Sequence, residues 1–382
     1  MRRPLAGLVV MPLAIAAVSA AEPDAEGRPL AWSVLAPLPD DRGVAGAFAG
    51  VSGGDQDDGA LVVAGGANFP SRPPWEGGAK TWHAAAYVLP SPGSGWLSAT
   101  PLPRPLGYGV TASFGGRIWC VGGGDATEHV RSTVALAWDA VTKTLAVEID
   151  ALPPLPRAMA LGGGVVAGGR LYVAGGQASP SATMALGTFW SIDLAAADAE
   201  RQWHEHPTWP GPERILPVLG TLDGQVYLVS GAELLPAAAD GTSGGTRRFL
   251  TDAYAFDPRH ETWRRIAPCP VPLVAAPGPA IPRGDSCLVF LPGDDGRLFF
   301  RQKELAGDHP GFAREIHVYD VRTDTWGRAK RVPEAVRPVV ATSTVSWRGG
   351  WVVPSGEVQP GVRSPQIVRL LPEPPPAPHG AR

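Results

Sequence analysis

"ALVVAGG" (residues 60–66) is the stretch that decides the fold, because it recurs along the chain. An apolar, β-rich run ending in a glycine pair or its remnant appears six times, closing at Gly66, Gly123, Gly176, Gly231, Gly293 and Gly356. These closing glycines are 57, 53, 55, 62 and 63 residues apart. A fixed period of this size indicates an array of equivalent structural units. Six such units fill the chain.

Two further strands are expected in each unit. The second carries aromatic and β-branched residues, as in "AAYVLP" (85–90) and "EIHVYD" (315–320), and the third is marked in most units by Trp96, Trp203, Trp263 or Trp326. The sixth unit ends before its tryptophan, and "AWSVLAPLP" (31–39) at the other end of the chain supplies the missing strand. Closing the ring in this way leaves no long exposed sheet edge. The sequence therefore predicts an all-β, six-bladed propeller over residues 31–371.

Composition agrees with a folded, turn-dense protein. Gly (48) and Pro (42) make up nearly a quarter of the 382 residues, yet 44% are hydrophobic and 13 are Trp. A formal net charge of −3 provides no basic stripe for phosphates, which excludes nucleic acid as a partner. Of the three cysteines, Cys120 is expected to be a buried thiol, and a disulfide between Cys269 and Cys287 stays open.

The two ends of the chain are expected to lie outside the propeller. Residues 1–21 combine Arg2 and Arg3 with an apolar run and small residues, which is the pattern of a secretory signal peptide. No later segment is apolar enough to cross a bilayer, so the mature protein is expected to be exported, to the periplasm, without a membrane anchor. The Pro-rich tail, residues 372–382, is expected to be disordered.

The glycine pairs followed by an aromatic residue and then Trp resemble the kelch family of β-propellers. The glycines and tryptophans themselves are expected to be structural: a Cβ would be crowded near the axis, and Trp fills space between blades. Fold does not settle function. The loops that follow each glycine pair meet at one mouth of a propeller, so candidate site residues are sought there.

Two of these loops carry the main candidates. The first, "ANFPSRPPWEGGAKTW" (67–82), offers Asn68, Phe69 and Arg72 for substrate binding, because a sugar presents apolar ring faces and hydroxyl rims. The sixth, "GEVQPGVRSP" (356–365), presents Glu357 and Arg363 around Pro360-Gly361, which suits a preorganised pair. The middle of the fourth loop, residues 237–246, is expected to be an exposed linker.

Three segments carry a closer resemblance. "GVAGAFAGV" (43–51), "VVAGGANFP" (62–70) and "PSGEVQPGVRSP" (354–365) are similar to the cyclically permuted mutarotase branch of the kelch propellers, whose members resemble bacterial N-acetylneuraminate epimerase. The resemblance implies that Glu357 and Arg363 are essential, and that Tyr108 in "GYGV" (107–110) lines the mouth. It also implies the reaction, conversion of the α-anomer of N-acetylneuraminate to the β-anomer.

Ring opening of a cyclic hemiketal needs a base and an acid. A carboxylate near the anomeric hydroxyl suits the base, and we assign Glu357. Arg363 is expected to bind the substrate carboxylate and to keep Glu357 ionised. Arg337, on a segment leading into a blade, is an additional candidate for substrate binding. The acid stays open between Tyr108, His129 and a bound water.

No metal or organic cofactor is expected, because the sequence shows no cluster that would bind one. Eight histidines without paired spacing also argue against a copper enzyme that resembles galactose oxidase. The turns "DPRHETW" (257–263) and "DVRTDTW" (320–326) are kelch-like and lack the Ser-x-Asp-x-Gly-x-x-Trp pattern of sialidases. The remaining alternative is a non-catalytic propeller that binds carbohydrate or protein. Such a protein would use the same mouth but would not need Glu357 to titrate.

Overall fold

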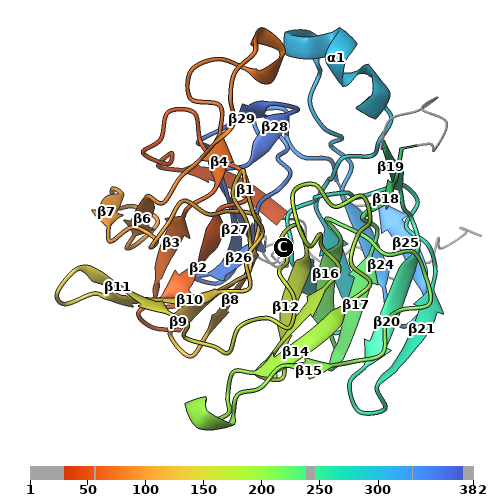
Figure 1. Ribbon diagram of the computed structural model, residues 1–382, viewed down its shortest axis with the longest axis horizontal. Coiled ribbons are helices and arrows are strands. Elements are labelled where there is room, and N and C mark those ends of the chain that lie inside the picture. Colours follow the sequence, from red (N-terminus) through yellow and green to blue (C-terminus); the bar gives the residue numbers. More distant parts are fainter. Residues whose placement is uncertain (1–29, 56, 238–245, 329, 373–382) are drawn as a thin grey trace, which may run out of the picture.

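Six four-stranded antiparallel sheets surround a central axis in the computed structural model (Figure 1), which describes residues 30–55, 57–237, 246–328 and 330–372. Blade 1 consists of β2 (Phe48–Ser52), β3 (Ala60–Ala64), β6 (Ala86–Leu89) and β7 (Leu97–Ala99). Blade 2 consists of β8 (Val110–Phe114), β9 (Arg117–Val121), β10 (Thr133–Asp139) and β11 (Thr144–Ile149). Blade 3 consists of β12 (Gly163–Ala167), β13 (Arg170–Ala174), β14 (Phe189–Asp193) and β15 (His204–Glu205).

The other three blades complete the ring. Blade 4 consists of β16 (Val218–Leu222), β17 (Gln225–Val229), β20 (Ala253–Asp257) and β21 (Thr262–Ile266). Blade 5 consists of β22 (Ile281–Arg283), β23 (Cys287–Phe290), β24 (His317–Asp320) and β25 (Thr325–Arg328). Blade 6 consists of β26 (Val345–Trp347), β27 (Gly350–Pro354), β30 (Ile367–Pro372) and β1 (Leu30–Leu35). The predicted six-bladed propeller is confirmed.

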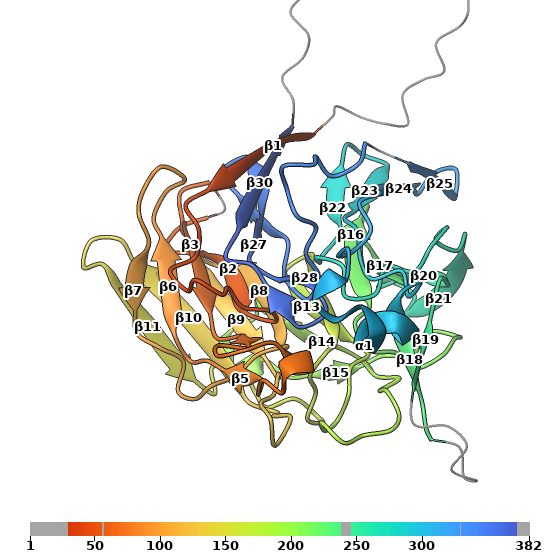
Figure 2. The same cartoon turned by 90° about the horizontal axis from the view of Figure 1, so that it is seen from above.

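Both ends of the described chain contribute to blade 6. β1 runs antiparallel to β30, with Leu30 opposite Pro372 and Leu35 opposite Ile367, and Figure 2 shows the two strands side by side. The N-terminal strand therefore becomes the outer strand of a sheet whose other strands come from the C-terminal end. This is the closure that the position of Trp32 predicts.

Three short hairpins and several helical turns lie outside the blades. The hairpins are β4–β5 (Ala67–Asn68 and Thr81–Trp82), β18–β19 (Ala232–Leu235 and Thr246–Phe249) and β28–β29 (Glu357–Gln359 and Val362–Arg363). The helical turns are 3-10 helices at Pro74–Glu76, Asp198–Glu200, Phe299–Arg301 and Ala306–Asp308, and α1 (Gln302–Leu305). Each hairpin begins directly after a closing glycine, so the hairpins share one end of the propeller.

A closed ring of six backbone hydrogen bonds surrounds the axis. One residue per blade takes part, and each N–H donates to the carbonyl of the equivalent residue in the preceding blade at 2.6–3.1 Å. All six residues have a left-handed φ, between 54° and 68°. They are Gly46, Tyr108, Leu161, Leu216, Ala275 and Ala341. All six residues border the narrow central channel, and all except Gly46 also border the wider cavity above it, so the ring forms the floor of that cavity.

The tryptophans of the outer strands connect each blade to a linker. The indole N–H donates to a backbone carbonyl at 2.8 Å in all four cases: Trp96 to Ala36, Trp203 to Pro153, Trp263 to Pro207 and Trp326 to Ala267. In blade 2 the apolar side chain of Leu145 is buried in the position that Trp occupies elsewhere. These contacts fit the predicted structural role of the tryptophans.

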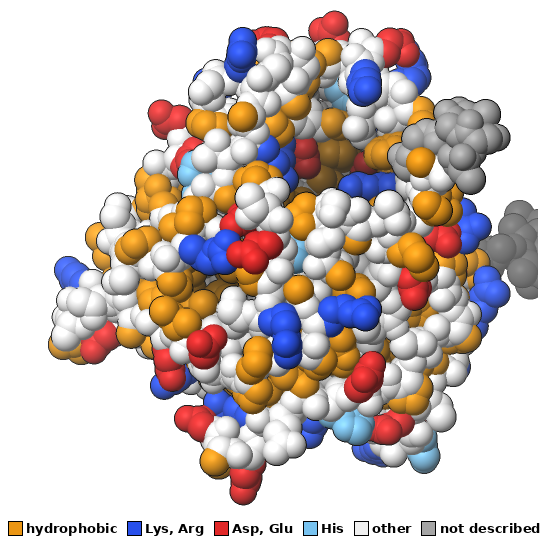
Figure 3. All heavy atoms as spheres, in the orientation of Figure 1, with side chains coloured by type: hydrophobic (Ala, Val, Ile, Leu, Met, Phe, Trp, Pro, Cys, Tyr) orange, Lys and Arg blue, Asp and Glu red, His pale blue; other side chains and the backbone are white. Residues whose placement is uncertain are grey.

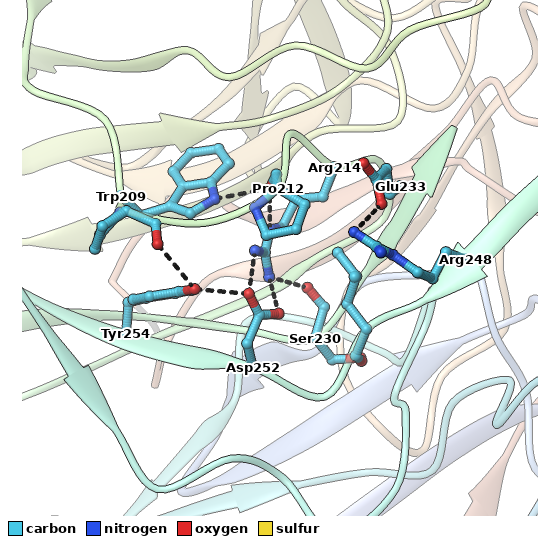
Figure 4. A network of polar contacts seen from close by, with 10 residues as sticks. Trp209, Pro212, Arg214, Ser230, Glu233, Arg248, Asp252 and Tyr254 are labelled. Carbon is cyan, nitrogen blue, oxygen red and sulfur yellow. Dashed lines mark hydrogen bonds and ion pairs between the residues drawn. The ribbon is translucent and has the colours of Figure 1, made fainter. Parts of the chain in front are cut away.

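A buried charge network stabilises blade 4 (Figure 4). The guanidinium of Arg214, fully buried, donates to both carboxylate oxygens of Asp252 at 2.9 and 2.8 Å and to the carbonyl of Ser230 at 2.9 Å. The hydroxyl of Tyr254 donates to the same carboxylate at 2.7 Å. At the edge of this view Arg248 pairs with Glu233 at 2.5 Å, and its side chain is 57% exposed.

The remaining expectations about the chain divide into two groups. Cys120 is a buried thiol as predicted, and Cys269 is also a buried thiol, which rules out its disulfide with Cys287. The expected signal peptide (1–21), most of the expected linker (237–246) and the expected disordered tail beyond Pro372 lie outside the described residues. Within the described part of the chain, no helix has the length and apolar character needed to cross a membrane.

Candidate active site

A cavity of about 740 Å³ opens at the end of the propeller that carries the hairpins. Figure 3 shows it as a hollow, with acidic and basic side chains on its wall. Its lining combines aromatic rings with four cationic side chains and two carboxylates. The charged lining residues are Lys80, Arg247, Lys303, Arg363, Asp294 and Glu357.

Glu357 and Arg363 face one another across the β28–β29 hairpin. They are register partners, and Nη1 of Arg363 lies 2.9 Å from Oε1 of Glu357. The backbone N–H of Gly361 donates to the same carboxylate oxygen at 2.7 Å. Among the described residues both contacts involve Oε1, so Oε2 is available to a bound molecule. The short loop through Pro360-Gly361 thus holds the carboxylate from two directions.

Arg363 is fixed on every side. Its side chain is 4% exposed, its guanidinium stacks on the ring of Phe69 at 4.9 Å, and Nε donates to the carbonyl of Ala67 at 3.3 Å. Nη2 lies 3.5 Å from the hydroxyl of Tyr108. Burial alone would lower the pKa of Arg363, but Glu357 and Tyr108 outweigh it and raise the pKa. Arg363 is therefore a permanent cation that orients Glu357.

Tyr108 belongs to the backbone ring and projects into the cavity. Its position depends on Gly46, the preceding member of the ring, because a Cβ at Gly46 would lie 2.5 Å from Cδ1 of Tyr108. Nζ of Lys80 lies 4.1 Å from the centre of the Tyr108 ring and 4.8 Å from that of Trp82. The first loop therefore adds a cation next to the Tyr108–Arg363 contact.

Arg247 and Asp294 lie on other parts of the cavity wall. Burial lowers the pKa of Arg247, while Asp294 and Glu357 act in the opposite direction. Burial raises the pKa of Asp294; the negative charges of Asp295 and Glu357 also raise it, whereas the Gly296 N–H and Arg247 oppose the rise. The cavity thus holds two carboxyl groups in different environments, one paired with a buried cation and the other pushed toward its neutral form.

Aromatic rings supply the apolar part of the lining. Trp75, Phe69, Phe299 and Phe312 all border the cavity, and the guanidinium of Arg247 lies 6.0 Å from the ring of Phe299. Flat apolar surfaces next to charged groups match the two surfaces of a sugar acid, its ring face and its carboxylate.

The structure brings four of the sequence candidates together and leaves three apart. Phe69, Tyr108, Glu357 and Arg363 line the cavity. Asn68 is 1% exposed, and its amide is taken up by the carbonyl of Gly43 at 2.9 Å and the His83 ring at 2.8 Å. Arg72 is exposed, and Arg337 is exposed with its guanidinium 3.4 Å from Gln359, outside the cavity lining.

The structure also bears on the identity of the general acid, which the sequence left open. His129 contacts the carbonyl of Gln177 at 2.8 Å and does not line the cavity, whereas Tyr108 does. Lys80, Arg247 and Asp294 line it without having been proposed from the sequence. The position of Asp294 in the repeat distinguishes it in the sequence, because it directly follows a closing glycine, as Glu357 does. Both residues form backbone bridges next to the ring, Asp294 with Val274 and Glu357 with Val340. At this repeat position the residues are Ala67, Gly124, Gln177, Ala232, Asp294 and Glu357.

Comparison with known proteins shows that this chain is distantly similar to N-acetylneuraminate epimerases. It is 26% identical over 245 residues to the Haemophilus influenzae (strain 86-028NP) protein of that name, covering 58% of this chain and 60% of the relative. A Brucella melitensis N-acetylneuraminate epimerase is 36% identical over 133 residues, 31% of this chain and 32% of the relative.

A kelch-like protein from Aspergillus terreus is 23% identical over 290 residues, 73% of this chain and 56% of the relative. The chain therefore spans less than two thirds of the length of these relatives. No protein-family model matches it. The resemblance that the glycine-pair and Gly-Glu segments predict is confirmed at the level of distant similarity.

Proposed function

We propose that this protein is a mutarotase that interconverts the anomers of N-acetylneuraminate or a closely related sugar acid. The observation that carries the proposal is the Glu357 carboxylate, held by Arg363 and the Gly361 N–H inside an aromatic cavity with an excess of cationic side chains. The similarity to N-acetylneuraminate epimerases supports the choice of substrate. Export to the periplasm is part of the proposal and rests on residues 1–21; N-terminal sequencing of the mature protein would test it.

In this mechanism Glu357 is the base. It removes the proton from the anomeric hydroxyl, so that the anomeric carbon–ring oxygen bond breaks and the open-chain ketone forms. Oε2, which is not engaged by Arg363 or Gly361, receives the proton. The ketone then rotates and recloses, and Glu357 returns the proton to the new anomeric oxygen. Arg363 acts mainly by orienting this carboxylate, since the pair is already formed without substrate.

Asp294 suits the role of the acid. A carboxyl group whose pKa is raised by burial and by nearby negative charge keeps its proton closer to neutral pH. In its neutral form it donates a proton to the ring oxygen as the ring opens and recovers it on closure.

The substrate carboxylate has several possible partners. Lys80 and Arg247 are cations of the cavity wall that do not pair with Glu357. A guanidinium forms two parallel hydrogen bonds to a carboxylate, which favours Arg247 as the partner. The aromatic side chains would then pack against the apolar face of the sugar.

A second function, binding without catalysis, is favoured by the same aromatic and cationic lining. Proton NMR of freshly released α-N-acetylneuraminate distinguishes the two, by following the approach to the β-anomer with wild-type protein, Glu357→Gln and the control Glu233→Gln, which lies outside the cavity. Acceleration that only Glu357→Gln loses supports the mutarotase. If the protein binds the sugar while the anomers interconvert at the spontaneous rate, it is a recognition protein. If it does not bind the sugar, N-acetylneuraminate is excluded as its substrate.

A further inference from the structure

Three metal-ligand side chains meet between blades 3 and 4, outside the lining of the active-site cavity. His204 belongs to β15, His206 follows it, and Glu261 lies in the turn between β20 and β21. Oε1 of Glu261 is 3.0 Å from Nε2 of His204 and 3.0 Å from Nδ1 of His206. The three ligand atoms lie within 4.8 Å of one another. One carboxylate oxygen therefore faces two imidazole nitrogens.

The sequence expectation that no histidines are paired is wrong at this point. His204-Glu205-His206 is an alternating pair, and residues two apart in an extended strand point to the same side. The pair alone predicts no metal, because the third group is 55 residues further along the chain. Only the packing of one blade against the next brings Glu261 to it.

His206 is built into the core in a fixed orientation. Its side chain is 5% exposed and packs among Tyr172, Phe189 and Phe256, with ring centroids 5.2–5.7 Å from its own. Nε2 lies 2.8 Å from the hydroxyl of Ser191. A hydrogen bond to one ring nitrogen, which leaves the other directed at the site, is the usual arrangement behind a metal-binding histidine.

Nδ1 of His206 has no hydrogen-bond partner within the part of the chain that the structure describes, although it lies beside the Glu261 carboxylate. Either a proton or a metal cation must separate such a nitrogen from a carboxylate oxygen.

The surrounding charge does not oppose a cation strongly. Arg170, whose Nη1 lies 3.4 Å from the hydroxyl of Ser191, pairs with Asp193 at 3.2 Å. His204 and Glu261 are 53% and 45% exposed, so an ion can enter from solvent and keep a water ligand. Two imidazoles and one carboxylate with an open position form a known zinc ligand set. Ligands about 2.0–2.2 Å from zinc stand roughly 3–3.5 Å apart, close to the two 3.0 Å distances from Glu261.

We propose that His204, His206 and Glu261 form a binding site for a divalent transition-metal ion, with zinc as the ion that fits this ligand set best. The ion would connect the outer strand of blade 3 to the β20–β21 turn of blade 4. Since β15 has only two residues, such a connection would stabilise the least extensive outer strand of the propeller. The site does not depend on the proposed mutarotase activity.

The test uses the full chain without a histidine tag, stripped with a chelator and titrated with zinc chloride by calorimetry. One zinc per chain with a rise in Tm is expected, and cobalt should give the absorption of a tetrahedral complex. His204→Ala and Glu261→Gln, which alter exposed side chains, should weaken binding at least tenfold, whereas His260→Ala beside them should not. Unchanged binding in both ligand variants, or no binding by the wild type at about 100 µM zinc, would overturn the proposal.

Discussion

Arg363 and Glu357 form an ion pair between cross-strand neighbours, so the geometry of the site is determined by the β28–β29 hairpin itself. The Gly361 N–H in the turn donates to the same carboxylate oxygen. A charge pair in an ordinary surface loop would be exposed and worth little. Here the cation is 4% exposed and the carboxylate 20%, so the pair is held before any substrate arrives.

Replacing Arg363 should damage both stability and activity. Arg363→Met would leave Glu357 in the cavity wall without its partner, and we expect a loss of about 2 kcal/mol in the free energy of unfolding, less than for a fully buried pair. Arg363→Lys keeps the charge but not the planar stack, so it should retain more stability while losing at least tenfold in rate. Urea unfolding and NMR mutarotation rates measure the two effects.

The control for this prediction is Arg72→Met. Arg72 comes from the neighbouring loop but is exposed and outside the cavity lining, so stability and rate should both stay within error. Equal losses in the Arg72 and Arg363 variants would mean that the overall charge of the mouth matters and the hairpin geometry does not.

The pH dependence of the rate should report on Asp294. An acid must carry its proton, and burial raises the pKa of Asp294. Catalysed mutarotation, corrected for the spontaneous rate, should therefore fall as pH rises through a pKa above the usual value near 3.9. Asp294→Asn should lower the rate by about 10²–10⁴-fold. A normal rate in Asp294→Asn would mean that Tyr108 or a water, and not Asp294, is the acid.

The same carboxyl group should affect stability. A raised folded-state pKa means that the stability present below the unfolded pKa is lost as pH rises through the folded one. Asp294→Asn, which cannot ionise, should therefore be more stable than wild type at pH 8, and the difference should shrink toward pH 4. Thermal unfolding at both values tests this, with the exposed Asp285→Asn as a matched control. A constant difference at all pH values would contradict it.

The sequence was sufficient for the ring but only partly for the site. Gly66 and its repeats set the period, and Trp32 reveals closure, because both belong to local patterns that recur in most of the units. Glu357 and Arg363 could be found because seven consecutive residues of one hairpin, 357–363, carry the whole pair. Asn68 lies in an equally polar loop, but its amide is satisfied by Gly43 and His83, which no spacing indicates.

Arg247, Asp294 and Glu261 were missed for a different reason. Each acts with residues from another blade, and their distances depend on how blades pack around the axis. Asp294 nevertheless occupies the same repeat position as Glu357, immediately after a closing glycine. Comparing all six repeats column by column would have identified it. Such a comparison of the repeats would not have identified Glu261, since only its contact with His204 and His206 distinguishes it.

Arg214 and Arg248 allow a direct comparison of a buried and an exposed charge pair within one blade. Burial alone would raise the pKa of Asp252, but its hydrogen bonds with Arg214 outweigh this and lower the pKa. Arg214→Met leaves that carboxylate buried without a cation, which should cost about 3–5 kcal/mol at pH 7. Arg248→Met removes a pair with a largely exposed cation and should cost at most about 1 kcal/mol.

The loss in Arg214→Met should also depend on pH. A depressed pKa gives stability above the unfolded value and loses it as pH falls through the folded one, so the gap between wild type and Arg214→Met should narrow in acid. Urea unfolding at pH 7 and at pH values below the unfolded pKa near 3.8 measures this change. If the Arg214 and Arg248 variants lose similar free energies of unfolding at pH 7, water must hydrate the Asp252 carboxylate once its partner is removed.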